Sequence, residues 1–140
     1  MVKPSSILLI EQNPIAARII QRQIQRWGYH LFDQCEDIRD AILAIDWEGP
    51  RPELVVVDLD GPISKEELQQ IRIFEFLYHV PLLFICCASV LEIKQLCEQA
   101  KDSFFLLKPY TEIQLGRVLH QVKSSSSLAR SKYHQLSSCF

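Results

Sequence analysis

The sequence predicts a doubly wound α/β protein with five βα units, that is, a five-stranded parallel sheet with helices on both faces. Three observations predict it: apolar runs of strand length recur, segments of helical periodicity separate them, and capping residues stand at the junctions. Five alternations of strand and helix with short connections favour parallel strands joined by right-handed crossovers. At 140 residues the chain has the length of one domain with its own core.

Four apolar runs are nearly continuous rather than alternating, which is typical of strands covered on both faces. They are residues 6–10 (SILLI), 54–58 (LVVVD), 81–87 (PLLFICC) and 104–107 (FFLL). A fifth run, residues 29–35 (YHLFDQC), has polar interruptions that suit an edge strand.

Helical spacing of apolar residues marks the segments between the strands. These are residues 14–28, 37–45, 66–79, 91–100 and 113–122. In the first, the pattern predicts a buried stripe of Ile15, Ile19, Ile20, Ile24 and Trp27.

Helix starts are marked as well. Asn13 and Asp37 are expected to cap the first two helices, and Pro14 suits a first helical position. The pairs Ser64/Glu67, Ser89/Glu92 and Thr111/Gln114 each have the spacing of a capping box.

The organisation predicts a folded domain over residues 1–123 and a serine-rich, basic tail or linker over residues 124–140. The four serines that follow Lys123 are expected to break or fray the last helix.

Composition excludes several classes of protein. Apolar residues make up 48% and charged residues 23%, no run of about 18 apolar residues suggests a membrane span, and the N-terminal apolar stretch is too short for a secretory signal. A cytoplasmic protein is expected.

The five cysteines form no CxxC pair, which favours reduced thiols over zinc or disulfides. Residues 1–112 carry 17 acids against 11 lysines and arginines, so the globular part is not expected to bind nucleic acid.

Polar side chains stand where the predicted strands end. Glu11 and Gln12 follow the first strand, Asp58 ends the strand 54–58, Cys86 lies in the next, and Lys108 follows the last. Ligands in such sheets bind beyond the carboxyl ends of the strands. Carboxylates with a lysine opposite could hold a divalent cation and a phosphoryl group there.

The stretches ILLIEQNP, LVVVDLDGP, PLLFICCA and FFLLKPYT resemble, in order and approximate spacing, the four signature stretches of two-component response-regulator receiver domains. The resemblance covers roughly Ser6 to Val122 and implies the CheY-like, flavodoxin-like fold. It implies that Asp58 is the phosphoacceptor, that Lys108 contacts the phosphoryl group and that Phe105 is the aromatic switch residue. It also implies that Glu11, Gln12, Asp58 and the backbone carbonyl of Asp60 hold Mg²⁺, and that Cys86 occupies the Thr or Ser position.

Two departures from the family pattern concern this chemistry. Gln12 replaces a carboxylate, which lowers the expected Mg²⁺ affinity to weak or absent. Cys86 is a weaker hydrogen-bond donor than a hydroxyl. A degenerate (pseudo-receiver) module that acts by protein contact is therefore preferred to a conventional receiver that is phosphorylated on Asp58 with Mg²⁺.

No enzymatic activity is expected, and the partners implied by the resemblance are a histidine kinase or phosphotransfer protein, an output protein, or both. A weak homodimer or a contact with a different partner protein is expected through the face of the fourth helix, fifth strand and fifth helix. This face would include Glu92, Lys94, Gln95, Phe104, Tyr110 and Arg117. A flavodoxin-like cofactor binder or redox protein is a remoter alternative, since EQNPIAA lacks the Ser, Thr and Gly of a phosphate loop. No helix-turn-helix segment fits within the chain, so any DNA-binding output would lie elsewhere.

Overall fold

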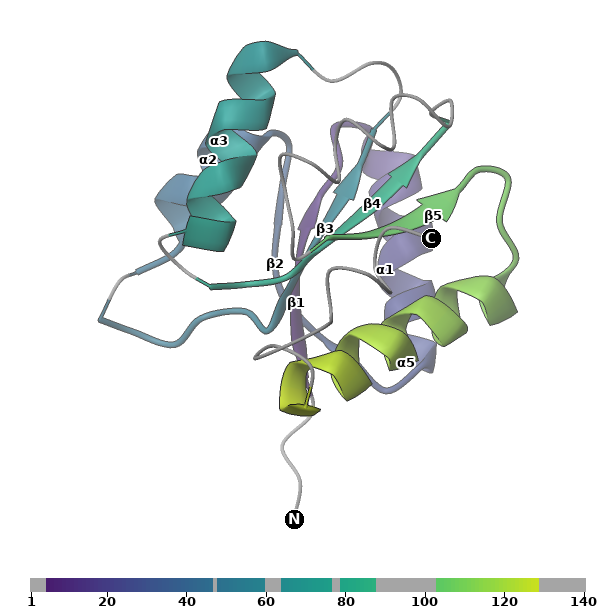
Figure 1. The fold of residues 1–140 in the computed structure, drawn as a ribbon. Helices are drawn as coiled ribbons and strands as arrows, with labels where there is room; N and C mark the ends of the chain where they lie inside the picture. The colour runs from purple at the N-terminus through teal and green to yellow at the C-terminus, as the bar shows by residue number, and fades with distance from the viewer. Residues whose placement is uncertain (1–4, 47, 60–63, 77–78, 88–102, 129–140) are drawn as a thin grey trace.

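The structure, a computed structural model, describes residues 5–46, 48–59, 64–76, 79–87 and 103–128. Within these residues one parallel sheet has the strand order β2-β1-β3-β4-β5 (Figure 1). The strands are β1 (Ser6–Ile10), β2 (His30–Cys35), β3 (Leu54–Asp58), β4 (Leu82–Cys86) and β5 (Ser103–Leu107). The predicted fold class is confirmed.

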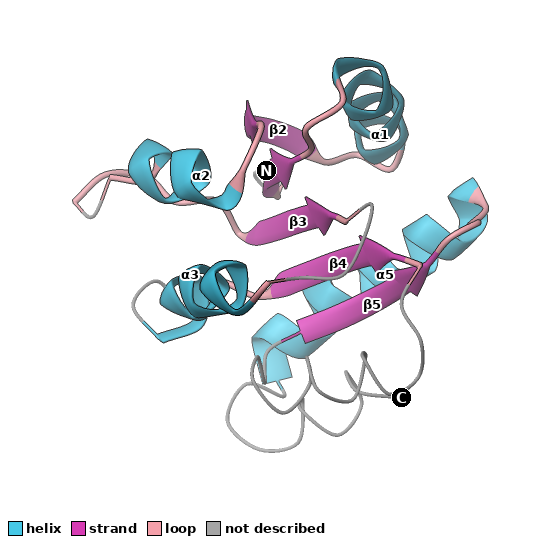
Figure 2. Cartoon of the chain, turned by 90° about the horizontal axis from the view of Figure 1, so that it is seen from above, coloured by secondary structure: helices cyan, strands magenta, loops and turns pink. Residues whose placement is uncertain are grey.

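Helices cover both faces of the sheet (Figure 2). Helices α1 (Pro14–Arg26) and α5 (Glu112–Leu128) lie on one face, and α2 (Ile38–Ala44) and α3 (Lys65–Phe76) lie on the other. The helix predicted over residues 91–100 falls outside the described residues.

The core consists of two layers, one on each face of the sheet. Because successive strand residues point to opposite faces, each central strand contributes to both layers. Leu8 and Val55 pack toward α2 and α3, whereas Leu9 and Val56 pack toward α1 and α5, and all four are fully buried. Strand β2 lies at the sheet edge and keeps several partly exposed residues, as its polar interruptions predict.

The predicted helix starts are confirmed wherever the structure describes them. The Asn13 side-chain oxygen accepts hydrogen bonds from the backbone N–H of Ile15 at 2.8 Å and of Ala16 at 3.2 Å. Asp37 caps α2 in the same way. The reciprocal bonds of both Ser64/Glu67 and Thr111/Gln114 form, while Ser89/Glu92 lies outside the described residues.

Helix α1 does not bury the predicted stripe. Ala17, Ile20 and Ile24 face the core, while Ile15 is 70% exposed and Ile19 is 52% exposed. At roughly 100° per residue, Ile15 lies about 140° around the helix axis from Ile20, and Ile19 lies about 140° from Ile24. The five residues therefore spanned too wide an arc to share one buried face, and the prediction for Ile15 and Ile19 was wrong.

Trp27, the fifth member of that stripe, is 44% exposed and lies at the C-terminal cap of α1. Its prediction as a core residue was wrong too, because it packs against α5 at the surface and not beneath α1.

Helix α5 continues through the serine run to Leu128, so the expected break after Lys123 was wrong. Serine has only a modestly lower helix propensity than alanine, and extending an existing helix adds a hydrogen bond with each residue. The division into a domain over residues 1–123 and a tail over residues 124–140 stays a prediction. No helix in the described part of the chain is long and apolar enough to cross a membrane.

Candidate functional site

Asp58 and Lys108 form an ion pair at the carboxyl edge of the sheet. Asp58 ends β3 and Lys108 directly follows β5, so the lysine side chain reaches past β4, which lies between those strands. The Asp58 side chain is 4% exposed and that of Lys108 is 24% exposed. The predicted meeting of this carboxylate and this ammonium is confirmed.

The backbone holds Lys108 in place for this contact. Its N–H donates to the carbonyl of Cys86 at 2.9 Å, which continues the β4–β5 ladder by one residue. Its ammonium also donates to the carbonyl of Leu59 at 3.3 Å. The ammonium therefore bridges the carboxylate that ends β3 and the next backbone carbonyl of that segment.

Glu11, just after β1, is 1% exposed at the same edge. One of its carboxylate oxygens accepts a hydrogen bond from the backbone N–H of Asn13 at 2.8 Å. Its own backbone N–H donates to the carbonyl of Cys35 at 2.9 Å. Because Asn13 in turn caps α1, the strand end, the carboxylate and the helix start form one hydrogen-bonded unit.

The residues at this edge fit a Mg²⁺ ion only in part. Glu11 and Asp58 supply two carboxylates, but Gln12 is exposed and offers an uncharged amide oxygen, and Asp60 lies outside the described residues. Over the part of the chain that the structure describes, no cluster of three or more His, Cys, Asp or Glu side chains could hold a metal ion. Mg²⁺ favours carboxylates and sheds water reluctantly, so Glu11 and Asp58 are the described side chains at this edge that would hold it.

Cys86 is 2% exposed and lies in the core layer that α2 and α3 cover, whereas its neighbour Cys87 is exposed. Phe105 stacks on Phe84 with ring centroids 5.4 Å apart. The predicted switch aromatic is thus packed against the strand that carries Cys86.

Tyr110, predicted to lie on the docking face, is close enough to the site to feel the charges of Asp58, Lys108 and Glu11. Its hydroxyl donates to the Gln23 side-chain oxygen at 2.8 Å, which ties the segment after β5 to α1. Burial raises the pKa of Tyr110; the charges of Asp58 and Glu11 raise it further, while Lys108 lowers it. No hydropathy signal distinguishes such a tyrosine, and only its position directly after Lys108-Pro109 pointed to the site.

The predicted docking face needs a further correction. Phe104 is 6% exposed and packs in the core between the sheet and α5, because it shares a strand face with Leu106. Arg117 is exposed, as predicted, whereas Glu92, Lys94 and Gln95 lie outside the described residues.

No protein-family model and no curated protein matches this chain. Solved structures do match. The signal receiver domain of a modulated diguanylate cyclase from Desulfovibrio desulfuricans G20 is 17% identical, with a TM-score of 0.72, over 90% of this chain and 98% of that one. The chemotaxis response regulator CheY4 of Vibrio cholerae is 18% identical, with a TM-score of 0.67, over 86% of this chain and 99% of that one.

A third match is the receiver domain of a sensor histidine kinase from Pseudomonas aeruginosa PAO1, described with a magnesium ion coordinated in its active-site cleft. It is 23% identical, with a TM-score of 0.66, over 88% of this chain and 100% of that one. These similarities extend over most of the chain, so this chain has the CheY-like fold of response-regulator receiver domains. At such identities they establish the fold alone.

Proposed function

We propose that this chain is a signal-receiving module of the phosphorelay type whose phosphoacceptor site is degenerate and which acts mainly by contact with another protein. The observation that carries the proposal is the ion pair of Asp58 and Lys108, placed beside the buried carboxylate of Glu11 at the edge where sheets of this kind bind ligands.

The retained pair has the chemistry for phosphoryl transfer to a carboxylate. Attack by Asp58 on a phosphoryl donor brings two anions together, and the Lys108 ammonium would neutralise charge that develops on the phosphoryl oxygens. A bound Mg²⁺ would supply further positive charge, and Glu11 and Asp58 would hold it. Among the described residues, this proposal keeps a nucleophile, one cation and two carboxylates for the metal, with Gln12 in place of a third.

Gln12 and Cys86 account for the proposed loss of function. Gln12 is exposed, so an ion at its side chain would keep much of its water and would gain no charge from the amide. The Cys86 thiol is a weak donor to a phosphoryl oxygen, and its burial limits how far it can turn toward the rim. Both changes weaken the adduct without disturbing the fold.

A conventional receiver, phosphorylated on Asp58 with Mg²⁺, is the second candidate. The intact pair of Asp58 and Lys108 favours it, and the similar Pseudomonas aeruginosa domain holds magnesium in its cleft.

Helix α1 offers a surface for the partner protein. Ile15 and Ile19 are large exposed apolar residues on the helix that starts two residues after Gln12, and the exposed Arg18 and Arg22 flank them. Exposed apolar residues gathered beside a site mark an interaction surface. A histidine kinase, a phosphotransfer protein or an output protein docking there would lie next to Asp58. The homodimer through the β5 and α5 side remains a further proposal.

Mg²⁺ affinity tests the proposed degeneracy. An added carboxylate a few ångströms from a divalent ion at a solvated rim contributes on the order of 2 kcal/mol, so Gln12→Asp should bind Mg²⁺ about 10- to 30-fold more tightly than the wild type. Isothermal titration calorimetry with MgCl₂ measures this, with Gln12→Asn as the uncharged control of similar size. Tight Mg²⁺ binding by the wild type, unchanged in Gln12→Asp, would favour the conventional receiver.

A further inference from the structure

A concave region lies between the C-terminal end of α1 and helix α5. It is a cavity of about 850 Å³, within the size range of small-molecule sites. Tyr29 and Ser5, which line one end, precede β2 and β1, so this end lies at the amino ends of the strands, away from Asp58. The receiver chemistry proposed for Asp58 makes no use of this cavity.

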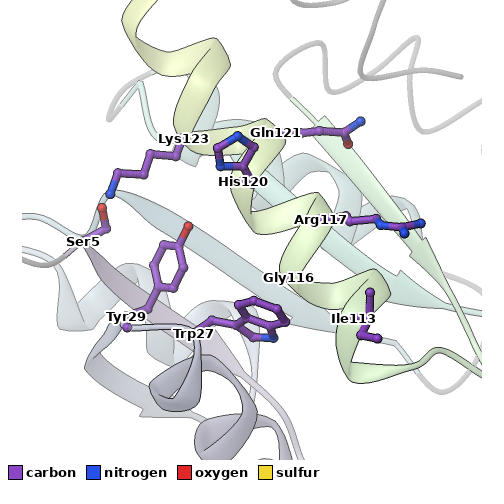
Figure 3. A pocket seen from close by; sticks show the side chains of 10 residues that line it. Ser5, Trp27, Tyr29, Ile113, Gly116, Arg117, His120, Gln121 and Lys123 are labelled. Atoms are coloured by element: carbon purple, nitrogen blue, oxygen red, sulfur yellow. The ribbon is translucent and has the colours of Figure 1, made fainter.

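One wall of the cavity is the indole ring of Trp27 (Figure 3). A Cβ atom added to Gly116 would lie 2.4 Å from this ring, so the ring rests directly on the bare backbone of α5. The indole N–H donates to the carbonyl of Glu112 at 3.0 Å, and the side chain of Glu112 accepts a hydrogen bond from Arg26 at 2.7 Å. These contacts hold the ring on α5 while 44% of Trp27 stays exposed.

Helix α5, on which this ring rests, also brings nitrogen donors to the cavity. Arg117, His120 and Lys123 all line it from α5. Figure 3 shows His120 between Lys123 and Arg117 along the helix, with Trp27 below Gly116. None of the described residues that line the cavity carries a carboxylate.

The electrostatic surroundings of Arg117, His120 and Lys123 differ along α5. Lys123 and Tyr29 also line a small adjoining cavity with Glu53, whose charge adds to the effect of burial in raising the pKa of Tyr29. The Lys123 end therefore has an acid nearby. Arg117, by contrast, forms no ion pair within the described part of the chain. The better place for a negative group is thus the Arg117 and His120 part of the helix. The Arg117 side chain, which extends away from His120 in Figure 3, would turn toward the bound anion.

The basic C-terminal segment is a poor occupant. Residues 129–140 carry Arg130 and Lys132 and no acid, so they would meet like charge on α5. A purely apolar ligand would leave the Arg117 and His120 donors unused.

We propose that this cavity binds a small flat aromatic anion, with its ring stacked on Trp27 and its phosphate or carboxylate accepting hydrogen bonds from Arg117 and His120. Arginine pairs with both kinds of anion through two parallel hydrogen bonds, and stacking on an indole suits any planar ring. The site is independent of phosphorylation at Asp58.

Isothermal titration calorimetry tests the proposal with two anionic probes, adenosine 5′-monophosphate and 2-naphthoate. At least one should bind with one-to-one stoichiometry. Adenosine, which lacks the anionic group, and inorganic phosphate, which lacks the ring, should bind at least about tenfold more weakly. Binding of the monophosphate alone would indicate a nucleotide-like ligand, and binding of 2-naphthoate alone would indicate an aromatic carboxylic acid.

Variants localise the binding. Arg117→Gln should weaken it about tenfold through loss of a charged hydrogen bond. Gly116→Ala, which places a methyl group where the indole lies, should abolish it while the circular dichroism spectrum stays helical. Arg39→Gln, the same charge change at an exposed position on α2, and Asp58→Asn should both bind like the wild type. Absence of binding by both probes, or equal affinity in Arg117→Gln and the wild type, would overturn the proposal.

Discussion

The side chains of Asp58 and Lys108 are 50 positions apart in the sequence, yet they meet because two strands of one parallel sheet end at the same edge. Their placement was predictable, since each is the polar residue that stops an apolar run. The placement of Glu11 was predictable for the same reason. Tyr110 was not, because its role depends on a hydrogen bond to Gln23 that no periodicity encodes.

The ion pair should be energetically coupled. In Lys108→Met the carboxylate of Asp58, 4% exposed in the wild type, would lose its cation, and we expect the free energy of unfolding to fall by about 2–3 kcal/mol. The loss should be smaller in the double variant Asp58→Asn/Lys108→Met, since no buried charge then remains. Urea unfolding of the wild type, Asp58→Asn, Lys108→Met and the double variant gives the coupling energy. Strictly additive losses would show that the pair is not coupled.

Cys35 should make stability fall at alkaline pH. Burial, and then the charges of Asp33, Asp40 and Asp37, raise the pKa of its thiol from 9.0 to about 11. The folded state therefore favours the protonated thiol. This contribution is full below about pH 9 and is lost as the pH rises through about 11, by on the order of 2 kcal/mol.

Urea unfolding under reducing conditions between pH 8 and pH 11 measures this loss. Cys35→Ala should show a shallower decline, although it is less stable at neutral pH, whereas Cys87→Ala, at an exposed thiol, should follow the wild type. Parallel declines in all three proteins would assign the effect to other groups, such as Tyr29 and Tyr110, whose pKa values are also raised.

At the scale of elements, the sequence predicted where the helices lie. It predicted less well which face of a helix is buried against the sheet. The caps at Asn13 and Asp37 follow from local hydrogen bonds and were correct. The orientation of α1 depends on the sheet beneath it, where Ala17 allows close approach and Ile20 and Ile24 fill the layer. Counting apolar residues could not separate that face from the exposed pair Ile15 and Ile19.

Two neighbouring isoleucines on α1 test this orientation. Ile20→Ala should lower the free energy of unfolding by about 2–4 kcal/mol, because Ile20 is 3% exposed. Ile19→Ala, at a residue 52% exposed, should change it by less than about 0.5 kcal/mol. Thermal or urea unfolding followed by circular dichroism compares them directly. Equal losses would contradict the described orientation of the helix.

At the scale of the whole molecule, five strands in the order β2-β1-β3-β4-β5 bring Glu11, Asp58 and Lys108 to one edge and leave the cavity between α1 and α5 toward the other. The first arrangement follows from topology and was predictable. The cavity was not predictable, because it depends on the contact between the Trp27 ring and Gly116, two residues far apart in the sequence. The molecule therefore carries the proposed phosphorelay site at one edge of the sheet and, toward the other, a separate proposed ligand site.

In the proposed function, Asp58 occupies a receiver-type site whose chemistry is weakened by Gln12 and Cys86. The most direct test is intact-protein mass spectrometry after incubation with acetyl phosphate and millimolar MgCl₂, followed by mapping of the modified peptide. We expect little or no phosphoryl adduct on the wild type, a clear adduct on Gln12→Asp/Cys86→Ser, and none when Asp58→Asn is added. A wild-type adduct as abundant as that of the double variant would contradict the proposed degeneracy, and absence of an adduct from both would contradict the receiver-type site itself.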